Sequence, residues 1–113
     1  MTTRPNNPYG PAVAYSAATR RSIAKMEEQI ALTEEYLGML SHFPSESNRI
    51  KHLVDYARLV GIAICLSYIA ENHRQWADYE RWQTIQGRYA RKVSDIEYNR
   101  PPAGLDAPTV GAL

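Results

Sequence analysis

The sequence predicts an all-α fold, an antiparallel helical hairpin with a shorter helix over 16–42, a long helix over 46–98 and an extended arm at each end. Two observations support this prediction. Apolar residues between the arms recur at spacings of three and four, which is the period of a helix. Six of the seven prolines lie in the first 11 residues or after residue 100, and only Pro44 is internal. The expected parts are therefore an arm over 1–15, a helical domain over 16–98 and an arm over 99–113.

The expected first helix begins at Ser16, whose hydroxyl can cap a helix N-terminus. It ends before Pro44, and the serines of segment 44–48 can cap the next helix. A connection this short predicts that the two helices are antiparallel neighbours. The first helix carries a coiled-coil-like seam, which consists of Ile23, Met26, Ile30, Thr33, Leu37 and Leu40.

The expected second helix keeps one apolar phase from Ile50 to Ile96 and contains no proline. An unbroken phase favours one continuous helix, roughly 80 Å long at 1.5 Å per residue. The alternative is a break near 71–73, which would fold the last third of the helix back and make a three-helix bundle.

Two apolar seams run along the middle of the long helix. One includes Ile50, Val54, Gly61 and Ile64, and the other is Leu59, Ile62, Leu66 and Ile69. The first helix can cover only one of them, and leaving four large aliphatic side chains in water would cost on the order of 6–12 kcal/mol. We therefore expect another copy, another protein or, as the weakest alternative, lipid to cover the second seam. The residues expected at this interface are Leu59, Ile62, Leu66, Ile69, Trp76, Tyr79 and Trp82, with Leu105, Val110 and Leu113 anchoring the C-terminal arm.

Composition and charge narrow the classes of partner and the cysteine chemistry that we expect. The chain has 113 residues, 44% of them hydrophobic and 22% charged, which is typical of one folded soluble domain. Its 13 basic and 12 acidic residues give a net charge of +1, so bulk charge favours neither a nucleic-acid nor an anionic-membrane partner. The lone cysteine, Cys65, excludes an intrachain disulfide. Because it lies in the most apolar segment, we expect a buried, inert thiol.

The sequence has no apolar run near its start that could serve as a signal peptide, so we expect a protein of the cytoplasm or of a virion or other large assembly. The most apolar stretch covers only the twelve residues 59–70. That falls short of the ~20 residues of a membrane span, which predicts a buried helix and no membrane span.

The sequence gives little support for an enzymatic function. None of His42, His52 and His73 has a glutamate three positions before it, as helical di-metal sites require. There is no phosphate-binding glycine loop and no nucleophile elbow. We therefore expect no enzyme, no cofactor and no metal.

Nucleic-acid binding is the main alternative function. Arg74, Arg81 and Arg88 are seven residues apart and share a helix face with interleaved aromatic residues. Segment 71–100, however, holds six basic and five acidic residues. Spacings of four predict ion pairs of Arg74 with Asp78 and of Arg91 with Asp95, so a solvated face is the simpler interpretation.

The expected function is therefore that of a non-enzymatic structural subunit, whose partners are copies of itself or other protein subunits. A helical hairpin with extended arms looks like the small helical accessory proteins of tailed-phage particles, such as connector, adaptor or internal proteins. That similarity is one of architecture and not of motif.

Overall fold

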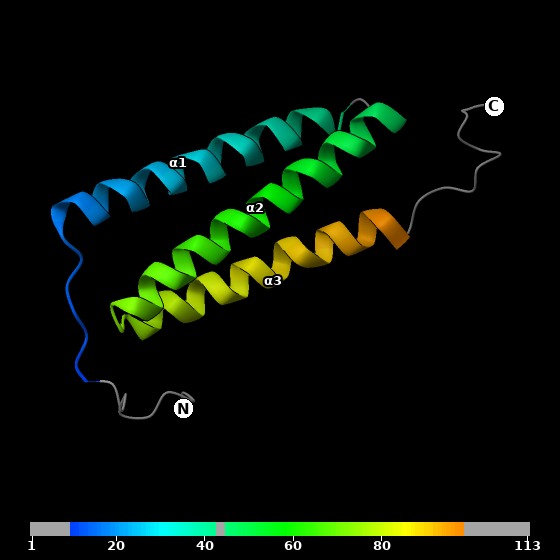
Figure 1. Ribbon diagram of the computed structural model, residues 1–113. Helices are drawn as coiled ribbons and strands as arrows, with labels where there is room; N and C mark the ends of the chain where they lie inside the picture. Colours follow the sequence, from blue (N-terminus) through cyan, green and yellow to red (C-terminus); the bar gives the residue numbers. More distant parts are fainter. Residues whose placement is uncertain (1–9, 43–44, 99–113) are drawn as a thin grey trace.

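The computed structural model describes residues 10–42 and 45–98, and these form three helices and no strand. The helices are α1 (Ala17–Leu40), α2 (Glu46–Asn72) and α3 (Trp76–Tyr98). Each helix runs antiparallel to the next, and α2 lies between the other two, packing extensively on α3 and less on α1 (Figure 1). The all-α prediction is confirmed. The expectations for residues 1–9, for Pro44 and for the C-terminal arm fall outside the described residues.

Helix α1 begins and packs as its sequence predicts. The Ser16 hydroxyl accepts a hydrogen bond from the Thr19 amide at 3.1 Å, which satisfies one of the free N–H groups of the first turn. Ile30, Thr33 and Leu37 are buried, while Ile23, Met26 and Leu40 are partly buried against the core. The coiled-coil-like seam is therefore the face that α1 turns toward the rest of the chain.

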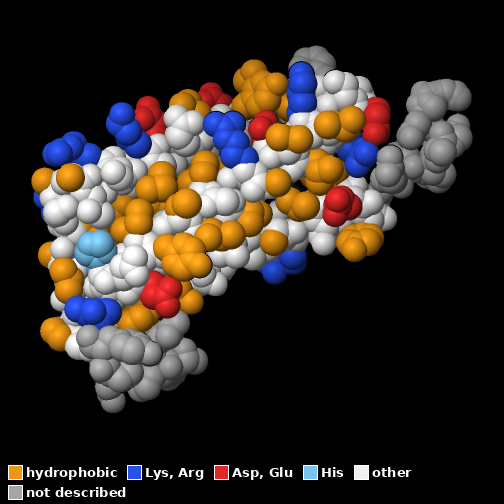
Figure 2. All heavy atoms as spheres, viewed as in Figure 1, with side chains coloured by type: hydrophobic (Ala, Val, Ile, Leu, Met, Phe, Trp, Pro, Cys, Tyr) orange, Lys and Arg blue, Asp and Glu red, His pale blue; other side chains and the backbone are white. Residues whose placement is uncertain are grey.

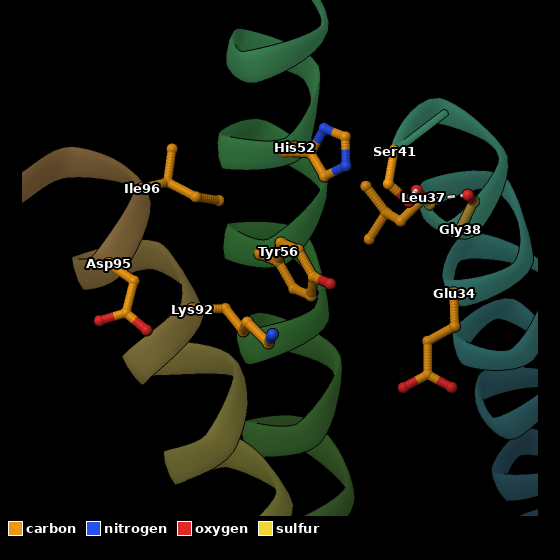
Figure 3. A pocket seen from close by; sticks show the side chains of 9 residues that line it. All are labelled: Glu34, Leu37, Gly38, Ser41, His52, Tyr56, Lys92, Asp95 and Ile96. Atoms are coloured by element: carbon orange, nitrogen blue, oxygen red, sulfur yellow. Dashed lines mark hydrogen bonds between the residues drawn. The ribbon is translucent and has the colours of Figure 1, made fainter. Parts of the chain in front are cut away.

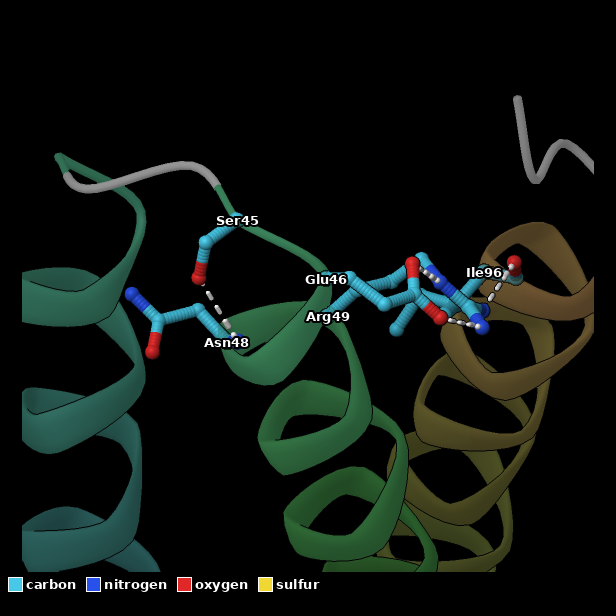
Figure 4. A network of polar contacts seen from close by, with 5 residues as sticks. All are labelled: Ser45, Glu46, Asn48, Arg49 and Ile96. Atoms are coloured by element: carbon cyan, nitrogen blue, oxygen red, sulfur yellow. Dashed lines mark hydrogen bonds and ion pairs between the residues drawn. The ribbon is translucent and has the colours of Figure 1, made fainter. Parts of the chain in front are cut away.

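The start of helix α2 is capped by a serine and is hydrogen-bonded to α3. Ser45 accepts a hydrogen bond from the Asn48 amide at 3.0 Å, as expected for a serine cap. Arg49 forms an ion pair with Glu46 at 2.8 Å, and another of its guanidinium nitrogens donates to the carbonyl oxygen of Ile96 at 3.4 Å (Figure 4). These contacts fasten the start of α2 to the end of α3.

The prediction of one continuous helix over 46–98 is wrong, and the alternative of a break near 71–73 is correct. Arg74 has a φ of +54°, in the left-handed region. Its amide donates to Glu71 at 3.0 Å, and the Gln75 amide donates to Ala70 at 2.9 Å. This pair of bonds is a Schellman motif, which usually has glycine where Arg74 stands. Periodicity alone could not reveal the turn, because neither glycine nor proline marks it.

The fold-back of α3 buries the seam that had been expected to need a partner. The core consists of Ile30, Leu37, Leu59, Ala63, Leu66, Trp82 and Tyr89. Leu59 is 0% exposed and Leu66 is nearly so, and Ile62 packs against them. Because α1 and α3 together cover this face of α2, the chain satisfies the apolar surface of Leu59 and Leu66 by itself.

Candidate interaction surface

The opposite face of α2 is apolar and exposed. We call it the α2 outer stripe, and it consists of Ile50, Val54, Ala57, Gly61, Ile64, Cys65 and Tyr68. Ile50 is 48% exposed, Val54 58% and Tyr68 61%, whereas Ile64 is partly buried. At 1.5 Å per residue the stripe is about 27 Å long. The first helix was expected to cover this seam and to leave the seam of Leu59 and Leu66 exposed. The structure shows the reverse.

The stripe faces outward because helix geometry sets it half a turn from the core residues. Leu59, Ala63, Leu66 and Ala70 are buried and point toward the core between the helices. At 100° per residue, Ile50 and Tyr68 lie about 180° from Leu59. In Figure 2, which looks at the side where α2 lies in front, hydrophobic side chains form a band along the middle of the molecule. A contiguous exposed apolar band is the kind of surface at which a protein can bind a partner.

Gly61 lies in the middle of the stripe, and no close packing inside the chain requires a glycine there. A Cβ atom added there would meet nothing within 4 Å, and its backbone is helical. Glycine in a helix interior costs about 1 kcal/mol relative to alanine. The cost is not offset by close packing within this chain.

Cys65 is exposed, and the expectation of a buried thiol is wrong. The apolar character of its neighbours in sequence suggested burial. The structure places Cys65 on the outer stripe, because the core needs only one face of the helix.

The expected interface residues divide between core and surface. Leu59, Leu66 and Trp82 are buried in the chain's own core, and Ile62, Ile69, Trp76 and Tyr79 are partly buried. Trp76 and Tyr79 pack edge to face, with ring centroids 5.7 Å apart. Leu105, Val110 and Leu113 lie outside the described residues. The residues that sequence reasoning missed as surface are those of the outer stripe, although their helical spacing was visible.

The described part of the N-terminal arm, residues 10–15, packs on the turn between α2 and α3. The Val13 amide donates to the carbonyl oxygen of His73 at 2.8 Å, and the Gln75 side chain donates to the carbonyl oxygen of Val13 at 2.9 Å. The Tyr15 ring meets the His73 ring edge to face at 4.9 Å. The arm thus adds its own hydrogen bonds to a turn that lacks glycine.

Two tyrosine hydroxyls link elements that are far apart in the sequence. Tyr15 donates to Asp78 at 2.9 Å, and Tyr89 donates to Glu34. Burial, followed by the hydrogen bond to Asp78, raises the pKa of Tyr15 to about 12. Burial and the Glu34 carboxylate likewise raise the pKa of Tyr89. Both hydroxyls are therefore held in the protonated, donating form.

A groove of about 510 Å³ opens between α1 and α3, with α2 as its floor (Figure 3). Glu34 and Ser41 line it from the α1 side, His52 and Tyr56 from α2, and Lys92, Asp95 and Ile96 from α3. The carboxylates and the ammonium group belong to exposed residues. The His52 ring nitrogen Nδ1 is engaged with the carbonyl oxygen of Asn48 at 2.7 Å. The charges of the groove are mixed, so its lining selects no single class of ligand.

Two of the arginines expected to share a nucleic-acid-binding face have partners within the chain. Arg74 Nε donates to the carbonyl oxygen of Pro11 at 2.8 Å. Arg81 pairs with Glu27 at 3.4 Å and lies over the Trp82 ring at 4.5 Å. The expected pairs of Arg74 with Asp78 and of Arg91 with Asp95 are not among the ion pairs of the described residues.

Among the described residues, no group of three or more histidine, cysteine, aspartate or glutamate side chains is placed to hold a metal ion. Helix α2 is long and apolar enough to cross a membrane by length and composition alone. The core helix of a soluble protein can pass the same test. Only 28% of the most apolar 18 residues of α2 are buried, however, so the prediction of a buried helix holds for one face of α2 and fails for the other.

No protein-family model, no curated protein and no solved structure matches the chain.

Proposed function

We propose that the chain is a non-enzymatic structural subunit that assembles with other protein subunits through the α2 outer stripe, in an assembly such as the connector or adaptor layers of a tailed-phage particle. The observation that carries the proposal is the exposure of Ile50, Val54 and Tyr68 along one face of the most apolar helix. The core is already complete without them, so a partner is the remaining way to remove this surface from water.

Burying the apolar surface of the stripe against a protein partner would contribute favourable free energy. Removing apolar surface from water contributes about 25 cal/mol per Å². A strip about 27 Å long and about 10 Å wide, the width of a helix, offers on the order of 300 Å². That area is below the roughly 800 Å² per partner of a standard interface, so the stripe would be one of several contacts that hold the subunit in a larger particle.

The test compares two exposed apolar residues on different helices. Val54 is 58% exposed on the outer stripe, and Leu32 is 53% exposed on α1. In the native source, the tagged wild-type chain is expected to elute during size-exclusion chromatography in a complex larger than its own 12.8 kDa. V54E is expected to elute as the free chain, because a buried unpaired carboxylate is costly.

L32E is the matched control and is expected to remain in the complex. Circular dichroism of the purified variants checks that both retain their helices. Elution of the wild-type chain as a monomer would contradict the proposal, as would a complex lost in L32E and retained in V54E.

A further inference from the structure

We propose that α1, together with the arm that precedes it, opens away from the α2–α3 hairpin as one unit while the hairpin stays folded. This inference concerns the packed side of α2 and is independent of the outer stripe. Proteins open in cooperative units, and the first units to open are those with few buried apolar contacts and many exposed hydrogen bonds. Both properties set α1 apart from the other two helices.

The hairpin holds most of the core. Helix α2 packs extensively on α3 and less on α1. Of the buried residues that form the core cluster, α1 supplies only Ile30 and Leu37, and the others belong to α2 or α3. Ile23 and Met26, in the N-terminal half of α1, are only partly buried. A helix of 24 residues is therefore anchored mainly by a short apolar segment in its C-terminal half.

Two hollows separate α1 from α3. The groove of about 510 Å³ lies between the C-terminal half of α1 and the end of α3 (Figure 3). A second hollow, of about 240 Å³, has Ile23 and Glu27 of α1 on one side and Arg81 and Trp82 of α3 on the other. Tightly packed interiors have few voids larger than a water molecule. The side of α1 that faces α3 therefore gains little from close packing.

Polar side chains span the distance between α1 and α3. Glu27 pairs with Arg81 at 3.4 Å, and the two side chains are 43% and 53% exposed. Glu34, an exposed residue, accepts the hydrogen bond from Tyr89. Ion pairs between exposed side chains contribute little stability. Because both carboxylates already meet solvent, water can replace their partners when α1 moves away.

The arm fastens the N-terminal end of α1 to α3. Tyr15 donates to Asp78 at 2.9 Å, and Arg20 of α1 donates to the carbonyl oxygen of Tyr15 at 2.8 Å. Ser16, the next residue after Tyr15, caps α1. A helix moves as a rigid rod, and the other end of α1 leads into α2. Helix α1 therefore leaves the hairpin only when Tyr15 also leaves Asp78.

Hydrogen exchange of the purified, full-length chain tests the inference, read amide by amide by NMR at a concentration where the chain is monomeric. An undocked helix of this length is only marginally stable in water, so its amides exchange while α1 is open. The slowest amides of α1 are expected to exchange faster than the slowest amides of α2 and α3, by roughly tenfold or more.

A substitution at Glu34 tests the contact that holds α1 closed. E34A removes the acceptor of the Tyr89 hydroxyl and so destabilises the closed chain, from which every opening starts. Exchange is expected to speed up about tenfold in all three helices. E35A makes the same change at the neighbouring exposed glutamate and is the matched control, which is expected to leave the rates unchanged.

A substitution within the hairpin separates the two kinds of opening. Gln83 of α3 donates to the Ser67 hydroxyl of α2 at 3.2 Å, a contact that the open state retains. Q83A is therefore expected to speed exchange of the slowest amides of α2 and α3 by about threefold. The amides of α1 should keep the wild-type rate, because α1 opens without breaking this contact.

Three results would overturn the inference. Equal rates for the slowest amides of all three helices would show that the chain opens only as a whole. An acceleration of α1 by Q83A that matches that of α2 and α3 would show the same. Slower exchange in α1 than in α3 would mean that α3 is the helix that leaves first. None of these results bears on the proposed function, whose own test is the native complex.

Discussion

Arg74 Nε donates a hydrogen bond to the carbonyl oxygen of Pro11, 63 residues earlier in the chain, while the backbone of Arg74 occupies the left-handed region at a φ of +54°. One residue thus both turns the chain between α2 and α3 and fastens the N-terminal arm to that turn. A glycine would make the turn with less strain, but it would lose this hydrogen bond to the arm.

Substitutions of Arg74 separate these two tasks. R74A keeps the strained backbone and loses the hydrogen bond to Pro11, so we expect its free energy of unfolding to fall by about 1 kcal/mol. R74G loses the same bond but relieves strain of about 1 kcal/mol, so it should be close to the wild type. Chemical denaturation of the three proteins checks this order. An R74G variant less stable than R74A would contradict the assignment of strain.

The hydrogen bond from Tyr15 to Asp78 makes the stability of the arm depend on pH. The pKa of Tyr15 is about 12 in the folded chain and ordinarily 10, so the folded state holds this proton more tightly. The stabilisation is complete below pH 10 and is lost as the pH rises toward 12.

We therefore expect the ultraviolet titration of Y15F to lack one of the late-ionising tyrosines seen in the wild type. Y36F, which changes an exposed tyrosine, is the control and should retain them. Identical late titrations in wild type and Y15F would show that the arm does not dock in solution.

The two faces of α2 should respond differently to the loss of side-chain volume. Leu59 is 0% exposed, and L59A is expected to lower the free energy of unfolding by about 2–5 kcal/mol through a core cavity. V54A on the outer stripe is expected to change it by less than about 0.5 kcal/mol at concentrations where the chain is monomeric. Thermal unfolding of dilute protein makes the comparison. A larger loss in V54A than in L59A would mean that the two faces are reversed.

Local signals in the sequence were sufficient to predict where α1 and α2 begin. Ser16 and Ser45 cap the helices that their positions predict, and the buried seam of α1 follows from its spacing. The turn at Arg74 could not be predicted in this way, because no glycine or proline marks it. The bond from Arg74 to Pro11 also joins residues that lie 63 positions apart in the sequence.

The turn at Arg74 decides which face of α2 is exposed. Once α3 folds back, Leu59 and Leu66 enter the core, and the seam that begins at Ile50 is left outside. Periodicity showed two apolar seams on α2, but it carried no information about which one the rest of the chain would cover. The exposed position of Cys65 was missed for the same reason.

The docking of the arm also orders events during synthesis. The residues that hold the arm, from His73 to Asp78, are made about 60 residues after it. Helices α1 and α2 can form while the chain is still growing, since their hydrogen bonds are local. Residues 10–15 must wait until the turn has left the ribosome, so a segment that is synthesised before all three helices docks only after α2 is complete.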